Sequence, residues 1–396
     1  MKIVFVTNYM NHHQKPVADS LYGVLGEDYK YVITNSMDEK FLKVGYSNND
    51  TLPYIVHYYD GKNETTVKQL CADADVMITG GTNVPELIQL RLNTKKLLLF
   101  YSERWHRRLI SYLPLPLRYL SGYNYKHYRR YNTENVYMLC SGAFVANDCR
   151  WEMAFKNKLY KWGYFPPFQE VDIDALLKKR FTHEIVEILW VSRMLKLKHP
   201  ELPIKTVHNL VKCGYNIHLT MIGGVFDEDP TSKTVYEACA DYVERNHLQK
   251  FIEFKGAMKN EQVCSMYEKA DIFLFTSSRY EGWGVVTNEA MSRGCAVIAS
   301  DMIGSTPYLI EDGVTGLSFK TGNLNDLTEK VRLLIDNPQL RIKLGLNAYN
   351  SIKNTWNPQK AAENLLLLCD GLLRGKDVEI TSGPCSKASP VVNKIF

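Results

Sequence analysis

Short apolar runs alternate with amphipathic stretches along most of the chain. In the first half, Pro16–Leu25 and Pro85–Leu92 have helical periodicity, and each starts with the proline that suits a first helical turn. The β-rich runs of this half are Lys2–Thr7, Tyr29–Thr34, Asp75–Thr79, Lys96–Tyr101, Val136–Cys140 and Tyr160–Tyr164. Strands that alternate with helices predict βαβ units and a parallel sheet.

The pattern stops at Phe165-Pro166-Pro167-Phe168, where two prolines indicate a linker, and then starts again. The predicted strands of the second half are Val186–Val191, Ile217–Ile222, Phe251–Phe254, Ile272–Phe275, Ala296–Ala299 and Gly316–Phe319. The helices between them are Ile204–Gly214, Thr234–Asn246, Glu261–Lys269 and Val285–Arg293. The chain therefore has the α/β class, with two Rossmann-like doubly wound domains, and we expect the ligand in the cleft between them.

Four segments follow from this pattern. Residues 1–166 form the N-terminal domain, and residues 167–358 form the C-terminal domain, which ends in helices from Leu324 onward. Residues 359–375 are a further helix that returns to the N-terminal domain. Residues 376–396 contain Ser, Gly and Pro without a clear pattern, so we expect a frayed tail.

Composition narrows the class of protein. The 396 residues carry 48 Lys+Arg and 43 Asp+Glu, a net charge of +5 that does not by itself indicate a nucleic-acid partner. The nine cysteines are dispersed and include no CxxC pair, which argues against a zinc site and a disulfide framework. The apolar N-terminus is too short for a signal peptide, and no apolar run reaches membrane-spanning length. We therefore expect a cytoplasmic protein.

The stretch from Ser277 to Gly294 reads as a strand end, a glycine loop and the start of a helix. Free amides at a helix start attract anions, and Gly282 and Gly284 let a phosphate approach the backbone. Glu281 and Glu289 bracket this loop, and carboxylates accept hydrogen bonds from vicinal hydroxyls. The pattern fits a diphosphate between two polyols, as in a nucleotide sugar. Alternatively, the spacing is chance and Glu289 is a solvated first-turn acid.

Three more loops follow predicted strands. Arg193 and Lys198 lie in the first and can converge on one anion, although solvated loop cations have the same appearance. Gly223-Gly224 ends the next strand. Met258 follows Lys255-Gly256, where small residues leave room for a nucleobase, although a plain strand end explains Met258 equally well.

The order of these parts is similar to that of a known family. This part of the chain resembles the donor-binding domain of the GT-B-fold retaining glycosyltransferases of family four. The resemblance rests on the arginine loop with its distal lysine, strand-GG, strand-KG, KADIFLFTSSRYEGWGVVTNEAMSRGCAVIAS and LIEDGVTGLSF. The resemblance covers about residues 186–320. His199 stands where the family usually has Gly, and Asn11–Gln14 stands where many members carry a glycine pair.

The resemblance implies a role for each matched residue. Arg193 and Lys198 would bind the donor diphosphate, together with the backbone amides from Gly284 through Val285 to Val286. Glu281 would contact the transferred sugar, and Glu289 the ribose. The anomeric configuration would be retained, and the departing phosphate would take the acceptor proton. Neither a metal nor a cofactor is required, because the nucleotide-diphosphate sugar is a substrate and cations offset its charge.

The first domain would then bind a saccharide or lipid-linked saccharide acceptor. His12 and His13 follow the first strand, and we prefer His13 as the residue that orients the acceptor hydroxyl or a donor phosphate. A surface or packing histidine is the plain alternative. Asn83 and Glu103, at the ends of other strands, are further candidates for acceptor contact.

Residues 104–131 contain seven Lys or Arg residues interleaved with aromatic residues and no acidic residue. Such a composition is typical of a surface that docks peripherally on an anionic membrane, here to reach a lipid-linked acceptor. A solvated basic face is the simpler alternative. Nucleic-acid binding shares the basic and aromatic signature, but nothing else in the chain resembles a nucleic-acid module.

Two other functions are open. A nucleotide-sugar epimerase of the same two-domain plan would bind the same donor, and a non-catalytic carbohydrate- or nucleotide-binding protein would use the same loops. An NAD-dependent enzyme is disfavoured, because Asn8–Gln14 after the first strand is not a glycine fingerprint.

Overall fold

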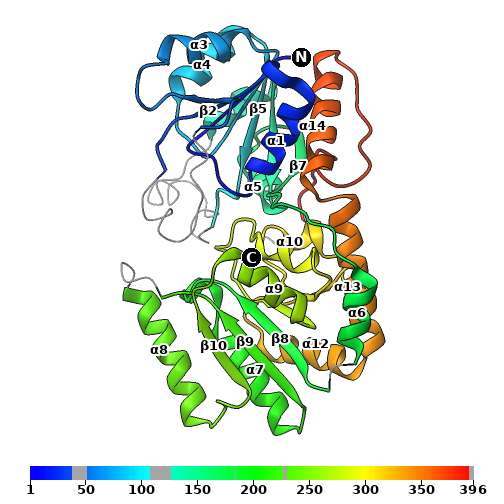
Figure 1. Cartoon of the computed structure of the whole chain (residues 1–396). Helices are drawn as coiled ribbons and strands as arrows, with labels where there is room; N and C mark the ends of the chain where they lie inside the picture. The colour runs from blue at the N-terminus through cyan, green and yellow to red at the C-terminus, as the bar shows by residue number, and fades with distance from the viewer. Residues whose placement is uncertain (38–50, 108–125, 183, 226–229, 392–396) are drawn as a thin grey trace. The chain divides into compact units, whose positions relative to one another are not determined.

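The computed structural model describes residues 1–37, 51–107, 126–182, 184–225 and 230–391. The chain divides into two compact units (Figure 1). Unit 1 contains Met1–Pro167 together with Thr355–Phe396, and unit 2 contains Phe168–Asn354. Both ends of the chain therefore belong to unit 1, and unit 2 is one continuous segment between them.

Unit 1 is built on a seven-stranded parallel sheet of order β3-β2-β1-β4-β5-β6-β7. Its strands are β1 (Ile3–Thr7), β2 (Tyr29–Ile33), β3 (Ile55–His57), β4 (Val76–Thr79), β5 (Leu97–Ser102), β6 (Val136–Ser141) and β7 (Leu159–Trp162). Its helices are α1 (Lys15–Leu25), α3 (Glu64–Asp73), α4 (Pro85–Asn93), α5 (Phe144–Glu152) and α14 (Pro358–Leu373). The strand order reverses between β1 and β4, so ligands are expected where these two strands end.

Unit 2 has a six-stranded parallel sheet of order β10-β9-β8-β11-β12-β13. Its strands are β8 (Val186–Val191), β9 (Ile217–Ile222), β10 (Ile252–Gly256), β11 (Ile272–Phe275), β12 (Ala296–Ser300) and β13 (Leu317–Phe319). Its helices are α6 (Ile173–Phe181), α7 (Glu201–Lys212), α8 (Pro230–Arg245), α9 (Asn260–Lys269), α10 (Val286–Met291), α11 (Thr306–Leu309), α12 (Leu324–Asp336) and α13 (Pro338–Asn354). The order reverses between β8 and β11. The expected fold class, two doubly wound α/β domains, is confirmed.

The expected frayed tail at residues 376–396 is wrong for the residues that are described. Residues 383–391 pair with β7, the edge strand of the first sheet. The Cys385 amide donates to the Lys161 carbonyl at 2.7 Å, and the Ala388 amide donates to the Leu159 carbonyl at 3.0 Å. The tail is ordered because an open strand edge offers backbone partners whatever the side-chain pattern is. In the same unit, α14 packs against α1 (Figure 1).

Among the described residues, no helix has both the length and the apolar character needed to cross a bilayer.

Candidate active site

Two loops meet at the reversal point of the sheet in unit 2, one after β8 and one after β11. The Ser278 amide donates to the Leu197 carbonyl at 2.8 Å, and the Thr276 hydroxyl donates to the Lys198 carbonyl at 2.7 Å. The indole of Trp190 in β8 donates to the same Thr276 hydroxyl at 3.0 Å. These bonds fix the backbone of Lys198 beside the loop that carries Glu281.

Lys198 and Glu281 form an ion pair between the lysine Nζ and the carboxylate Oε2. The two side chains are only 10% and 14% exposed. Water therefore screens the pair weakly, and loss of one partner would leave a poorly solvated charge. The sequence places both residues in the site, and the structure shows that they contact each other directly.

The glycine loop runs from Gly282 into α10. Gly284 has φ +82°, and a Cβ there would lie 2.3 Å from the Phe275 ring, so both the backbone and the space require glycine. Trp283 is fully buried, and its indole donates to Asn288 Oδ1 at 2.8 Å. Packing of Gly284 on Phe275 and the bond from Trp283 to Asn288 thus fix the loop at the start of α10.

Helix α10 spans Val286–Met291 and is shorter than the expected Val285–Arg293. A tight turn ends it, because the Arg293 amide bonds Ala290 O and Gly294 takes the left-handed φ of +66°. The amides of Val285 and Val286 lie at its first turn, where helical N–H groups have no intrahelical acceptor. They are therefore available to an anion.

Glu289 is partly buried on α10 and is not a freely solvated acid. Tyr267 donates its hydroxyl proton to Glu289 Oε2 at 3.1 Å. Burial raises the pKa of Glu289, while the Tyr267 hydrogen bond and the charge of Arg293 oppose that rise. The structure therefore favours an oriented carboxylate over the solvated alternative.

The loops after β8, β9 and β10 also pack closely together. A Cβ on Gly223 would lie 1.7 Å from the Ser192 carbonyl oxygen, and the Gly223 amide donates to Gly256 O at 2.9 Å. Gly223 thus has a structural reason to be glycine besides any contact with a ligand. Arg193 follows Ser192 and is exposed, and Met258 lies just after Gly256. Arg193 and Lys198 therefore come from one loop but occupy different environments.

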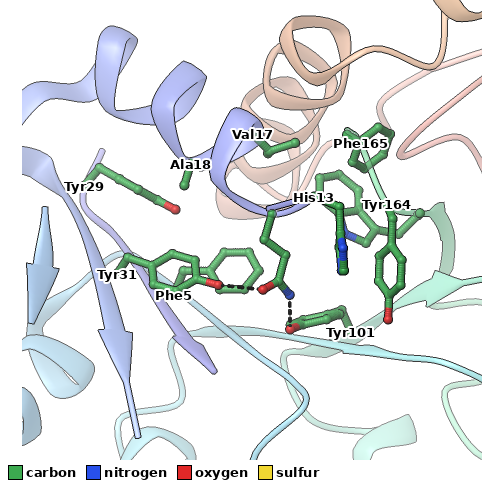
Figure 2. A pocket seen from close by; sticks show the side chains of 12 residues that line it. Phe5, His13, Val17, Ala18, Tyr29, Tyr31, Tyr101, Tyr164 and Phe165 are labelled. Carbon is green, nitrogen blue, oxygen red and sulfur yellow. Dashed lines mark hydrogen bonds between the residues drawn. The ribbon is translucent and has the colours of Figure 1, made fainter. Parts of the chain in front are cut away.

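In unit 1, His13 lies in a small aromatic cavity of about 20 Å³ (Figure 2). Its ring stacks on Tyr164, with 4.1 Å between the ring centroids, and His12 packs edge-on against it at 4.9 Å. Burial, with a smaller effect of His12, lowers the pKa of His13 to about 3. His13 is therefore neutral near pH 7, and its buried Nδ1 has no hydrogen-bond partner among the described residues.

The other acceptor candidates lie in two places. Glu103 accepts the hydroxyl proton of Tyr164 at 2.7 Å, which joins Glu103 to His13 through one side chain. Asn83 instead lines a separate groove where β1, β2 and β4 end. The groove also contains Asn8 and Asn35, which our sequence reasoning missed. Their position directly after strands was the available signal.

Most of the basic and aromatic segment 104–131 lies outside the described residues. Of its described part, Arg104, Trp105 and Tyr131 are buried. Arg104 lies over the Phe144 ring at 4.7 Å, and the Trp105 amide donates to Asp148 at 2.6 Å. These residues contribute to the interior of unit 1, so they are not part of a lipid-facing surface.

Comparison with known proteins agrees with this geometry. Residues 177–351, which make up most of unit 2, match the family model described as Glycosyl transferases group 1. The capsular polysaccharide biosynthesis glycosyltransferase CapM of Staphylococcus aureus is 24% identical over 274 residues, 65% of this chain and 68% of CapM. Residues 177–351 are therefore a group 1 glycosyl transferase domain.

Solved structures extend the likeness in fold to both units. A glycosyltransferase from Rickettsia africae has a TM-score of 0.66 at 15% identity, covering 95% of this chain and 99% of its own. HepE of Anabaena in complex with UDP has a TM-score of 0.65 at 14% identity, covering 92% and 100%. The fold is GT-B. Several other curated relatives match over half of their own length or less.

Proposed function

We propose that this chain transfers a sugar from a nucleoside diphosphate sugar to a hydroxyl of a saccharide or lipid-linked saccharide, with retention of anomeric configuration, in glycan biosynthesis. The observation that carries the proposal is the ion pair between Lys198 and Glu281 at the reversal point of unit 2, with Glu289 in the first turn of α10 that follows. HepE, which shares the fold, has been solved with UDP and with UDP-glucose.

In this proposal, unit 2 binds the donor. Lys198 and Arg193 bind the diphosphate together with the amides of Val285 and Val286, and Glu289 accepts hydrogen bonds from the ribose. Once Lys198 turns to the diphosphate, Glu281 can accept hydrogen bonds from the transferred sugar. The cations and amides stabilise the charge that develops on the leaving phosphate, so the transfer needs no metal ion.

His13 has a role that differs from general base catalysis. A group with a pKa of about 3 is a weak base at neutral pH, so the departing phosphate is the better acceptor of the hydroxyl proton. A neutral imidazole still offers one donor and one acceptor. We assign His13 to orienting a substrate oxygen, with His12 and Glu103 near it.

The decisive experiment combines binding with turnover. A thermal-shift screen of nucleoside diphosphates identifies the base, since a ligand that binds only the folded state raises its stability. The matching nucleotide sugars are then incubated with and without saccharide acceptors. Transfer with retention supports the proposal, whereas an epimerised nucleotide sugar in the absence of acceptor would show an epimerase. Binding without turnover under every condition would show a carbohydrate-binding protein.

Peripheral docking on the cytoplasmic face of a membrane through residues 104–131 stays a prediction. It rests on the cations of this segment, because Trp105 and Tyr131 are buried and Tyr128 is partly buried against Trp105. Sedimentation with neutral and anionic vesicles tests it. Equal binding to both kinds of vesicle would contradict it.

A further inference from the structure

A polar groove of about 580 Å³ lies in unit 1 where β1, β2 and β4 end, which is the reversal point of that sheet. It is distinct from the cavity around His13. Its lining includes mainly amide and hydroxyl side chains: Asn8, Thr34, Asn35, Ser36, Thr82 and Asn83. The rings of Tyr9 and Tyr58 complete the wall.

The loops that form this groove are bonded to one another. The Asn35 amide donates to the Asn8 carbonyl at 2.8 Å, and the hydroxyls of Thr34 and Thr82 are 2.5 Å apart. Gly81 has φ +69°, and a Cβ there would lie 3.3 Å from Thr7 Oγ1. The groove is therefore built by backbone contacts between three strand ends and has a defined form before a ligand binds.

Its chemistry matches a polyol. Amides and hydroxyls both donate and accept hydrogen bonds, as sugar hydroxyls do. The side chains of Asn83 and Ser36 have no hydrogen-bond partner within the described part of the chain. They are available to a ligand, and Tyr58 lines the same groove.

The described lining of the groove carries a negative charge and no positive charge. Among its described lining residues, Glu86 is the one that carries a formal charge. Glu86 accepts the Tyr58 hydroxyl proton at 3.0 Å and lies in the first turn of α4. The carboxylate thus offsets the positive end of the helix dipole, which would otherwise attract an anion. A ligand carboxylate or phosphate would meet repulsion here and no matching cation among the described lining residues.

We propose that this groove binds an uncharged part of the acceptor saccharide and that Glu86 excludes uronate and phosphate groups from it. That this saccharide is the acceptor rests on the function proposed above. Selection by charge and binding by the groove do not depend on that function. They are tested without any donor.

The probes are matched pairs of p-nitrophenyl glycosides, the glucoside and galactoside against the glucuronide and galacturonide, which differ only in whether C6 is an alcohol or a carboxylate. Affinity is measured by ligand-observed NMR titration of the full chain. We expect the better neutral glycoside to bind about threefold more tightly than its uronide, because Glu86 is exposed and water screens its repulsion of a ligand carboxylate. Asn83→Ala should weaken neutral binding about fivefold, the loss of one hydrogen bond.

The variant Glu86→Gln separates charge from packing. It should strengthen uronide binding about threefold and leave neutral binding unchanged. Glu27→Gln is the matched control. Glu27 precedes β2, so it lies at the amino ends of the strands, whereas the groove lies at their carboxyl ends. Four results would each overturn the proposal. Two concern the wild type: uronide binding as tight as neutral binding, or no neutral binding at 50 mM. Two concern the variants: unchanged neutral binding in Asn83→Ala, or an equal response of both probes to Glu86→Gln.

Nucleotide-sugar turnover is measured on the same variants. Failure to turn over any nucleotide sugar, with charge discrimination intact, would refute the proposed transferase and leave the groove assignment standing. Transfer activity without discrimination between neutral and uronide probes would refute the groove assignment and leave the proposed transferase standing.

Discussion

Lys198 and Glu281 lie 83 residues apart in the chain and form an ion pair that is nearly closed to solvent. One comes from the loop after β8 and the other from the loop after β11, so the pair spans the point where the strand order reverses. A diphosphate at this point would compete with Glu281 for Lys198. Donor binding would thereby release a carboxylate toward the sugar.

This relationship predicts the effect of Lys198→Ala. The variant loses a charged hydrogen bond to the diphosphate, which is worth about 1.5–3 kcal/mol of binding free energy. Titration of the preferred nucleoside diphosphate by calorimetry measures it. Lys196→Ala is the control, because Lys196 is an exposed cation of the same loop. Equal affinities in wild type and Lys198→Ala would refute the assignment.

Glu289 provides a second prediction, on the ribose. We expect Glu289→Gln to weaken binding of the nucleoside diphosphate about three- to tenfold, since one acceptor of two hydroxyl protons becomes an uncharged amide. The 2′-deoxy analogue should lose less, because it lacks one of those hydroxyls. Tyr267→Phe, which removes the hydroxyl bonded to Glu289, should fall between wild type and Glu289→Gln. Identical losses for both nucleotides would contradict a ribose contact.

The depressed pKa of His13 predicts how stability changes with pH. The folded state binds the His13 proton only near pH 3, whereas the unfolded state binds it near 6.5, so His13 destabilises the fold as pH falls below 6.5. Between pH 6.5 and 5 the loss is about 1–2 kcal/mol. Urea unfolding of His13→Gln should show a smaller loss over this range than wild type.

His218 is the matched control for that measurement. The hydrogen bond that His218 donates to the Glu187 carboxylate raises the pKa of His218, so its contribution is present at low pH and disappears as pH rises through the folded-state pKa. His218→Gln should therefore lose stability on acidification more steeply than wild type. A His13→Gln profile that follows the wild type would show that His13 is not buried as described.

The pairing of residues 383–391 with β7 predicts the effect of a truncation after residue 382. The shortened chain loses the backbone bonds to Leu159 and Lys161 and the bonds from Asn147 and Asn364, for a total of about 2–5 kcal/mol of unfolding free energy. Hydrogen exchange should show loss of protection at the Lys161 amide. Truncation after residue 391 is the control, and a protected Lys161 in the shorter chain would contradict the pairing.

The sequence was a reliable guide where side-chain pattern decides structure. The predicted strands form because their apolar runs are buried on both faces, as in β1 and β11. Helix α5 escaped notice because seven of its nine residues are buried, among them Asn147, Asp148 and Glu152, so it has no amphipathic period. Strand β3 is three partly buried residues at a sheet edge, too short to give a pattern.

The same distinction between local patterns and distant contacts applies to the candidate site. Glycine loops and carboxylates after strands predict Gly284, Glu281 and Glu289 as site residues, because that signal is local. The pairing of Lys198 with Glu281 and the stacking of His13 on Tyr164 are contacts between distant segments, which no local pattern encodes. For the same reason, the sequence could not show that Gly223 must be small beside Ser192.

The division of the chain has a consequence for synthesis on the ribosome. Unit 2 is continuous and can fold as soon as residue 354 has left the exit tunnel, while unit 1 still lacks α14 and the strand-like tail that covers β7. The first unit to be translated is therefore the last to be completed. Until residues 385–388 have left the tunnel, its edge strand stays open to neighbouring nascent chains.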